Sequence, residues 1–202
     1  MPQHATLAAL QERIRACRRC AEAGYPVGEP PIFSGPATAQ AMIIGQAPGY
    51  TEMTHQRPFN FTSGTRLFKW LAQAGWAEDD FRARHYMASV TRCYPGKHAS
   101  GRGDRVPTRE EQDLCAEWRA AELALLDLKL IIPVGKLAIG LYYNVKQPLK
   151  AIIGTTKTVG GVHIVPLPHP SGASTWHMQA ANQALIDDAI GHLRHIRAEY
   201  NL

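Results

Sequence analysis

Residues 41–49 read Ala-Met-Ile-Ile-Gly-Gln-Ala-Pro-Gly, an apolar run that stops abruptly at a loop containing glycine and proline. The apolar run predicts a short buried strand at 41–44, and the glycines and proline predict the turn that ends it. Further strand candidates lie at 85–91, 130–134 and 162–167, separated by segments with helical patterns. Strands that alternate with helices indicate an α/β fold. We predict a three-layer α/β/α sandwich around a central, mostly parallel four-stranded sheet.

The segments between these strands carry helix signals. An apolar stripe at helical spacing predicts an N-terminal helix (Leu7, Leu10, Ile14 and Cys17). Ser63 is expected to cap a helix that ends at Gly75, and Thr108 with Glu111 forms a capping box for a helix reaching about residue 127. Two more helices are predicted, one ending near 143 and one covering 185–196. Ligands of such folds bind beyond the C-terminal ends of the strands, so we expect the site in loops 45–62, 92–107 and 168–176.

The composition restricts the class of protein. The chain has 202 residues, of which 45% are hydrophobic and 19% charged, enough for one domain (1–202) with an apolar core. A small disulfide-stapled scaffold is excluded. No apolar run approaches the ~20 residues of a membrane span, and no secretory signal pattern opens the chain, so we expect a cytoplasmic location.

Positive charge is concentrated in one segment. The net charge is +5, and between residues 81 and 109 seven bases face a single acid, Asp104 (Arg82, Arg84, Arg92, Lys97, Arg102, Arg105 and Arg109). A solvated loop would explain this pattern, but a contact with a nucleic-acid backbone is the stronger interpretation. We expect Lys97, Arg102 and Arg105 to contact phosphates.

Four cysteines suggest a metal centre. Cys17 and Cys20 form a C-x2-C pair near a helix end, Cys93 follows a predicted strand, and Cys115 lies early in the next predicted helix. Four thiolates suit tetrahedral zinc or an iron–sulfur cluster, and unconnected reduced thiols are the third possibility. One close pair joined by two distant single cysteines favours the larger cluster, because zinc sites more often use two C-x2-C pairs.

Taken together, these segments resemble the iron–sulfur uracil-DNA glycosylases, families 4 and 5 of the uracil-DNA glycosylase superfamily. The resemblance runs from Cys17 to about Ser171 and keeps its motifs in order. They are C-x2-C at 17–20, IIGQAPG at 43–49, RPF at 57–59, Cys-Tyr-Pro-Gly at 93–96, Pro-Thr-x-x-Glu before Cys115, IIPVGKLA at 131–138 and LPHPS at 167–171.

The resemblance implies a DNA-repair hydrolase that flips a uracil nucleotide out of DNA and cleaves its N-glycosidic bond. It implies a [4Fe-4S] cluster on Cys17, Cys20, Cys93 and Cys115. It places His169 against the base carbonyl that gains charge, and Phe59 beneath the base as a stacking surface. The resemblance also gives roles to two groups of residues. One is the loop that contacts the base and the attacking water (Gly45, Gln46, Ala47, Pro48 and Gly49). The other is the segment that presses on the minor groove (Pro170, Ser171 and Gly172).

Two positions depart from the family pattern. Gln46 stands where family 4 usually carries an acid; its amide can orient a water or recognise a base but cannot act as a general base. Glu52 is therefore the next candidate to handle the water, with a solvated loop acid as the alternative. Ser89 stands where family 4 has an asparagine that recognises uracil, and a hydroxyl lacks the paired donor and acceptor of an amide.

The same residues are compatible with other functions. The same fold can serve a broader glycosylase acting on hypoxanthine or xanthine, or a DNA-binding protein with weak catalysis. A zinc-dependent nucleotide hydrolase is a further alternative, and it would lack the visible absorption of an iron–sulfur protein. We expect the partner to be DNA that contains uracil or another deaminated base, and the chain to act as a monomer.

Overall fold

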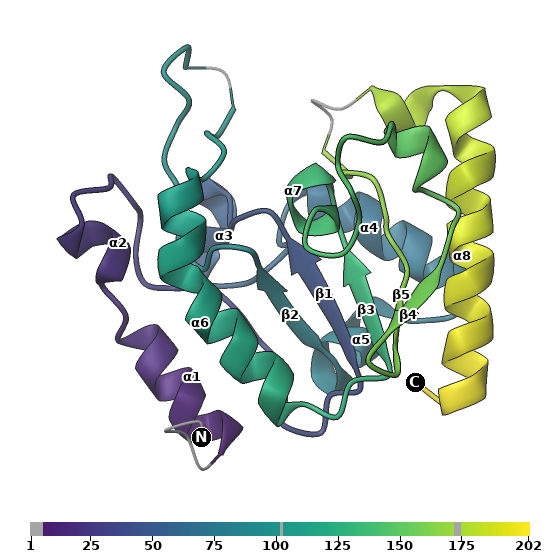
Figure 1. Cartoon of the computed structure of the whole chain (residues 1–202), viewed down its shortest axis with the longest axis horizontal. Helices are drawn as coiled ribbons and strands as arrows, with labels where there is room; N and C mark the ends of the chain where they lie inside the picture. Colours follow the sequence, from purple (N-terminus) through teal and green to yellow (C-terminus); the bar gives the residue numbers. More distant parts are fainter. Residues whose placement is uncertain (1–5, 102, 172–174) are drawn as a thin grey trace.

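The computed structural model describes residues 6–101, 103–171 and 175–202. Its centre is one five-stranded sheet in the order β2-β1-β3-β5-β4 (Figure 1). The strands are β1 (Ala41–Gly45), β2 (Tyr86–Ser89), β3 (Leu130–Pro133), β4 (Lys157–Val159) and β5 (Val162–Ile164). β2, β1, β3 and β5 pair in parallel, while β4 pairs with β5 in antiparallel orientation. The predicted α/β class and mostly parallel sheet are confirmed, and the predicted number of four strands was one too few.

Eight α-helices and two short 3-10 helices are seen in the described residues. The α-helices are α1 (Leu7–Arg15), α2 (Arg19–Glu22), α3 (Tyr50–His55), α4 (Thr62–Gln73), α5 (Glu78–Arg84), α6 (Arg109–Leu125), α7 (Lys136–Ile139) and α8 (Ala180–Tyr200). The 3-10 helices are η1 (Leu149–Ala151) and η2 (Trp176–Met178). No described helix is long and apolar enough to cross a membrane.

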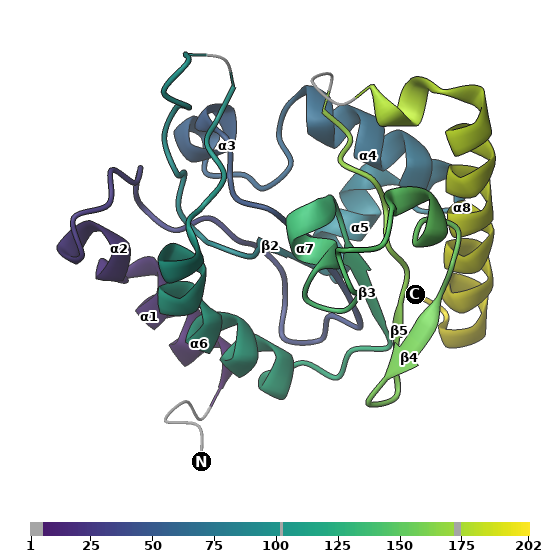
Figure 2. The same ribbon diagram turned by 45° about the horizontal axis from the view of Figure 1, so that its top comes forward.

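Helices cover both faces of the sheet and create two cores. On one face α4, α5 and α8 bury residues such as Leu71, Phe81 and Ile190 against Ile43 and Ile132 of the sheet. On the other face α1 and α6 pack against the alternate strand residues, including Ile44 and Ile131. Because successive strand side chains point to opposite faces, the uninterrupted apolar runs of β1 and β3 supply both cores. Figures 1 and 2 show the resulting three layers.

The outer edge of β2 is covered by the chain that precedes β1. Ser34 pairs with Met87, and Gly28 pairs with Tyr94 just beyond the strand. The Ile32 amide also donates to the Arg92 carbonyl over 2.7 Å. Residues 28–34, predicted only as irregular connection, therefore fix the position of the segment that leads from β2 to Cys93.

Helix starts follow the predicted signals in one case and not in another. Thr108 caps α6 together with Glu111, as the capping box predicted. Ser63 is not a helix cap: α4 begins one residue earlier, after Phe61, without a side-chain cap. Gly75 follows α4 with φ of +103°, the left-handed conformation that suits glycine after a helix.

The strands converge on loops at their C-terminal ends. The loop after β2, α3, and the start of α4 all extend beyond the same end of the sheet (Figure 1). The predicted strand 162–167 breaks after Ile164, but Leu167 still bridges Val134. That pairing brings the segment starting at Pro168 to the same end of the sheet.

Candidate active site

A pocket of about 390 Å³ opens at the C-terminal ends of β1, β2 and β3, and its volume lies in the range of small-molecule sites. All three loops predicted to carry the site contribute to it. Its lining includes the predicted residues Gly45, Gln46, Ala47, Pro48, Gly49, Glu52, Phe59, Ser89, Arg105, His169, Pro170 and Ser171. Residues scattered over more than 120 positions of sequence therefore surround a single cavity.

The loop after β1 leaves little room for side chains at two positions. A Cβ on Gly45 would lie 3.0 Å from the Phe59 ring and 3.2 Å from the Ser89 hydroxyl. A Cβ on Gly49 would lie 2.6 Å from a Glu52 carboxylate oxygen. Glycine at both positions lets the backbone form the wall of the pocket.

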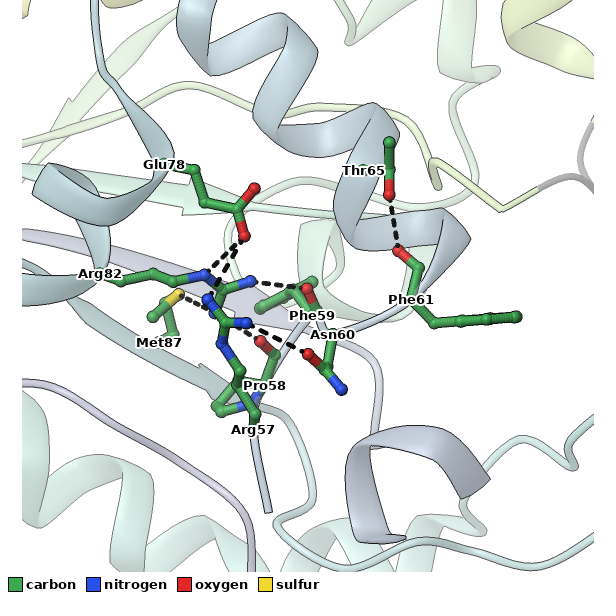
Figure 3. A network of polar contacts seen from close by, with 9 residues as sticks. All are labelled: Arg57, Pro58, Phe59, Asn60, Phe61, Thr65, Glu78, Arg82 and Met87. Atoms are coloured by element: carbon green, nitrogen blue, oxygen red, sulfur yellow. Dashed lines mark hydrogen bonds and ion pairs between the residues drawn. The ribbon is translucent and has the colours of Figure 1, made fainter. Parts of the chain in front are cut away.

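Phe59 is held in an unusual backbone conformation by Arg82. Its φ of +52° is rare for a residue with a side chain. The Arg82 guanidinium donates to the carbonyls of Pro58 and Phe59, both over 2.8 Å, and pairs with Glu78 on its own helix (Figure 3). Gly64 completes the arrangement, since a Cβ there would lie 1.9 Å from the Phe59 carbonyl oxygen. Sequence analysis assigned Arg82 only to the basic segment and missed this role.

His169 has a defined proton arrangement. The backbone N–H of Ser171 donates to His169 Nδ1 over 3.2 Å, and the Ser171 hydroxyl lies 2.9 Å from the same nitrogen. Because an amide N–H only donates, Nδ1 accepts, and the proton of the neutral ring is on Nε2. Burial, with a smaller contribution from His177, lowers the pKa of His169 below its ordinary value and favours this neutral form.

The segment that carries His169 is fixed on both sides. Gly135 has a φ of +83°, and a Cβ there would lie 3.0 Å from the His169 ring. On the other side, Arg66 of α4 donates to the Pro170 carbonyl over 2.5 Å. Gly172 lies outside the described residues.

The Glu52 carboxylate is hydrogen-bonded to the backbone around it. One carboxylate oxygen accepts from the Gly49 N–H over 2.5 Å, which forms the N-terminal cap of α3. Burial raises the pKa of Glu52, while the hydrogen bond from Gly49 opposes this and the nearby Asp104 adds to it. This arrangement makes Glu52 a support of the loop at 45–49.

Asp104 lines the same pocket and was not predicted as a site residue. The loop 96–105 folds back on itself, with a bridge between Lys97 and Asp104. Tyr94 donates to Asp104 over 3.1 Å, and Lys97 pairs with it over 3.3 Å. The only signal in the sequence was its isolation as the single acid among seven bases.

The predicted phosphate contacts have different surroundings. Lys97 keeps 61% of its side chain exposed despite its contact with Asp104. Arg105 instead makes a two-pronged pair with Glu111, over 2.6 and 2.7 Å, in which the Glu111 side chain is only 2% exposed. Arg105 therefore anchors the loop to α6. Arg102 lies outside the described residues.

The four cysteines come together at a second cavity. Cys17 follows α1, Cys20 lies in α2, Cys93 follows β2, Cys115 lies in α6, and all four line the same enclosed space. None of them forms a disulfide. The Trp118 indole N–H donates to Cys17 Sγ over 3.2 Å. Among the described residues, no three His, Cys, Asp or Glu side chains are grouped so as to hold a metal ion as they stand.

A buried cation lies beside this cavity. Arg92 is 1% exposed, and its Nε and Nη1 have no hydrogen-bond partner in the described part of the chain. Its remaining nitrogen pairs with the fully buried Glu122, which also accepts from the Tyr86 hydroxyl over 2.9 Å. Burial and the nearby Cys115, Glu111 and Cys17 raise the pKa of Cys20 to about 11, which keeps this thiol protonated at neutral pH while no cation is bound to it.

Comparisons with known proteins agree with this geometry. The model of the uracil DNA glycosylase superfamily matches residues 32–194. A type-4 uracil-DNA glycosylase of Thermotoga maritima is 25% identical, over 80% of both chains. A type-5 uracil-DNA glycosylase of Thermus thermophilus is 30% identical, over 78% of this chain and 77% of the relative. A type-4 uracil-DNA glycosylase of Pyrobaculum aerophilum is 29% identical, over 62% of this chain and 59% of its own length.

Proposed function

Because the chain belongs to the uracil DNA glycosylase superfamily, we propose that it hydrolyses the N-glycosidic bond of uracil in DNA, with the nucleotide flipped into the pocket. The observation that carries the proposal is the convergence of Phe59, His169 and the loop 45–49 on one cavity. An aromatic surface, a neutral hydrogen-bond donor and a wall of backbone suit a flat, polar base. The type-4 and type-5 names of the relatives support the same activity.

His169 has the proton arrangement that the departing base requires. As the glycosidic bond breaks, the electron pair stays with the base and negative charge gathers on its carbonyl oxygen. The Nε2–H of His169, fixed by the Ser171 N–H on the opposite nitrogen, would donate to that oxygen. A donor held in place before the reaction stabilises this charge without reorganising, and this is a large contribution to catalysis.

Gln46 and Ser89 would recognise the base and orient water with neutral groups. Gln46 offers an amide donor and acceptor, and Ser89 a single hydroxyl at the end of β2. One hydroxyl discriminates bases less strictly than an amide. Deaminated purines such as hypoxanthine and xanthine are therefore the second class of substrate to test.

The cysteine cavity fits a [4Fe-4S] cluster. The donors are four thiols around one space, from three segments of the chain: the Cys17 and Cys20 pair, Cys93 and Cys115. A zinc site more often uses two C-x2-C pairs. The buried Arg92, with two unpartnered nitrogens, supplies positive charge next to the anionic cluster that four thiolates create. When bound, the cluster would hold α1, α2, α6 and the end of β2 together.

We further propose that the 1–202 chain acts on DNA as one domain, as a monomer, in the cytoplasm. Lys97 would contact phosphates, and Pro170 and Ser171, at the rim of the pocket, would contact the minor groove. Arg105 would first support the loop, because two of its five N–H donors are used by the buried Glu111.

The decisive experiment is a cleavage assay on single- and double-stranded oligonucleotides that contain uracil, hypoxanthine or xanthine. We expect abasic sites with uracil as the preferred base. Preference for a purine would support the broader glycosylase. Binding without cleavage of any of them would contradict the proposal and favour a DNA-binding protein.

A further inference from the structure

Two carboxylates approach the loop 45–49 from opposite parts of the chain, and they differ in what they contact. Glu52 comes from α3, and Asp104 comes from the returning arm of the loop 96–105. The position of a Cβ on Gly49 lies 2.6 Å from Glu52 Oε2 and 3.3 Å from Asp104 Oδ2. Both carboxylates therefore lie on the Cβ side of Gly49, with these two oxygens no more than about 6 Å apart.

The Glu52 carboxylate accepts hydrogen bonds from the backbone. Its Oε2 accepts from Gly49, and backbone hydrogen bonds from Phe59 and from its own N–H also lower the cost of its charge. These hydrogen bonds stabilise the charged carboxylate and oppose the effect of burial, which raises its pKa.

Asp104 has its two oxygens in different environments. Oδ1 accepts from the Tyr94 hydroxyl and from Lys97 Nζ. Oδ2 faces Gly49 and accepts no hydrogen bond within the described part of the chain. The side chain is 32% exposed, so water reaches it, and the residue lines the same pocket as Gln46 and His169.

The donor that orients Asp104 is itself fixed. Tyr94 is 7% exposed, and the Tyr50 ring packs against it edge-on with 5.9 Å between ring centres. Burial and the hydrogen bond to Asp104 raise the pKa of Tyr94 to about 12, so its hydroxyl remains a donor at neutral pH. One face of the aspartate is thereby held, and the other is presented to the pocket.

We propose that Asp104 is the residue that accepts the proton of the attacking water, a role that rests on the function proposed above. The water oxygen forms a bond to C1′ of the sugar, and the C1′–N bond breaks with its electron pair leaving on the base. The proton lost by the water passes to Asp104 Oδ2 and then to solvent, and the base anion takes a proton from solvent. Gln46, which accepts no proton, would orient the same water.

The test is single-turnover cleavage of a uracil oligonucleotide by D104N, D104E and the control D113N, with DNA affinity measured by fluorescence anisotropy. Asp113 is an exposed acid on α6 that pairs with Arg109, so D113N makes the same chemical change away from the pocket. D104N should lower the rate by ~10²-fold or more, the scale of lost general-base catalysis. Its DNA affinity should be unchanged or higher, since a negative charge near phosphates is removed. D104E keeps a carboxylate and should regain at least tenfold, while D113N should cleave like the wild type.

The outcomes separate this inference from the proposed function. A D104N rate within threefold of the wild type overturns the role of Asp104 and leaves the glycosylase intact. D104E as slow as D104N also overturns it, because the carboxylate would then not be the active feature. A wild-type protein that cleaves no uracil DNA overturns both. Y94F, which keeps the carboxylate but removes its donor, should lose less than D104N; an equal loss would assign Asp104 to loop structure alone.

Discussion

The backbone N–H of Ser171 donates to Nδ1 of His169 over 3.2 Å, two residues away in the same tight segment. The chain itself therefore decides which imidazole nitrogen carries the proton. A histidine on a surface loop would exchange its two neutral forms freely, whereas the Ser171 N–H favours the form of His169 that carries its proton on Nε2.

Replacing His169 with alanine should lower the single-turnover cleavage rate by ~10²–10³-fold, because a fixed donor to the developing charge is lost. DNA affinity should change little, since phosphate contacts dominate it. The matched control is His195→Ala, whose side chain is 82% exposed near the end of α8. Cleavage by His169→Ala at the wild-type rate would remove this residue from the catalytic set.

The pH dependence of cleavage should reflect the neutral form of His169. Burial lowers the pKa of His169 below 6.5, so the rate should stay level from pH 8 to 6.5 and fall only in more acidic buffer. The contribution of His169 to the free energy of unfolding depends on pH in the same direction. The folded state binds this proton less readily than the unfolded state, so the contribution is fully present above pH 6.5 and declines below it. His169→Asn cannot titrate, and its rate should lose this acid limb. An unchanged limb would assign it to another group.

Arg82→Lys should disturb Phe59 without touching the pocket directly. A lysine cannot serve both carbonyls and Glu78 together, and lost charged hydrogen bonds cost about 1.5–3 kcal/mol. We expect that loss in the free energy of unfolding and a slower cleavage rate. Arg84→Lys is the control, because Arg84 lies on the same helix with 47% of its side chain exposed. Equal effects of the two substitutions would contradict a specific role for Arg82.

Substitutions of Lys97 and Arg105 should affect different properties, DNA binding in the first case and folding stability in the second. Lys97→Ala should reduce the slope of log Kd against log salt by about one phosphate contact and leave the melting temperature near that of the wild type. Arg105→Ala leaves Glu111 buried without its partner, at a cost of about 3 kcal/mol in unfolding free energy. Denaturant unfolding and salt titrations of both variants check this. The reverse assignment would mean that Arg105 contacts DNA.

Cys115→Ala should lose iron and the broad absorption near ~400 nm, and it should unfold more easily because cluster binding contributes folding free energy. Iron analysis of the purified variant is the direct measurement. Iron content and melting equal to the wild type would remove Cys115 from the ligand set.

Local signals in the sequence were sufficient for the centre of the fold. β1 and β3 are uninterrupted apolar runs, and the start of α6 is defined by the side chains of Thr108 and Glu111. The edge strand β4 was missed because Lys157 and Thr158 carry no apolar signal. The Gly160-Gly161 pair that joins it to β5 is a typical hairpin turn and would have indicated it.

The site was predictable where a residue belongs to one of the family motifs and unpredictable where tertiary contacts decide. His169, Phe59 and the 45–49 loop all line the pocket, as expected. The orientation of Asp104 depends on Tyr94, and the engagement of Arg105 depends on Glu111. Both are side-chain contacts that depend on the folded path of the loop. Counting the charged residues between positions 81 and 109 could not predict either of them.

The two edges of the sheet have a consequence for aggregation at high protein concentration. Exposed strand edges are templates on which other chains add and aggregate. Here residues 28–34 already occupy the edge of β2, and β4 at the opposite edge is only three residues long and begins with Lys157. A sheet protected in this way resists edge-to-edge growth, so the segment before β1 acts as a guard against misassembly as well as a brace for Cys93.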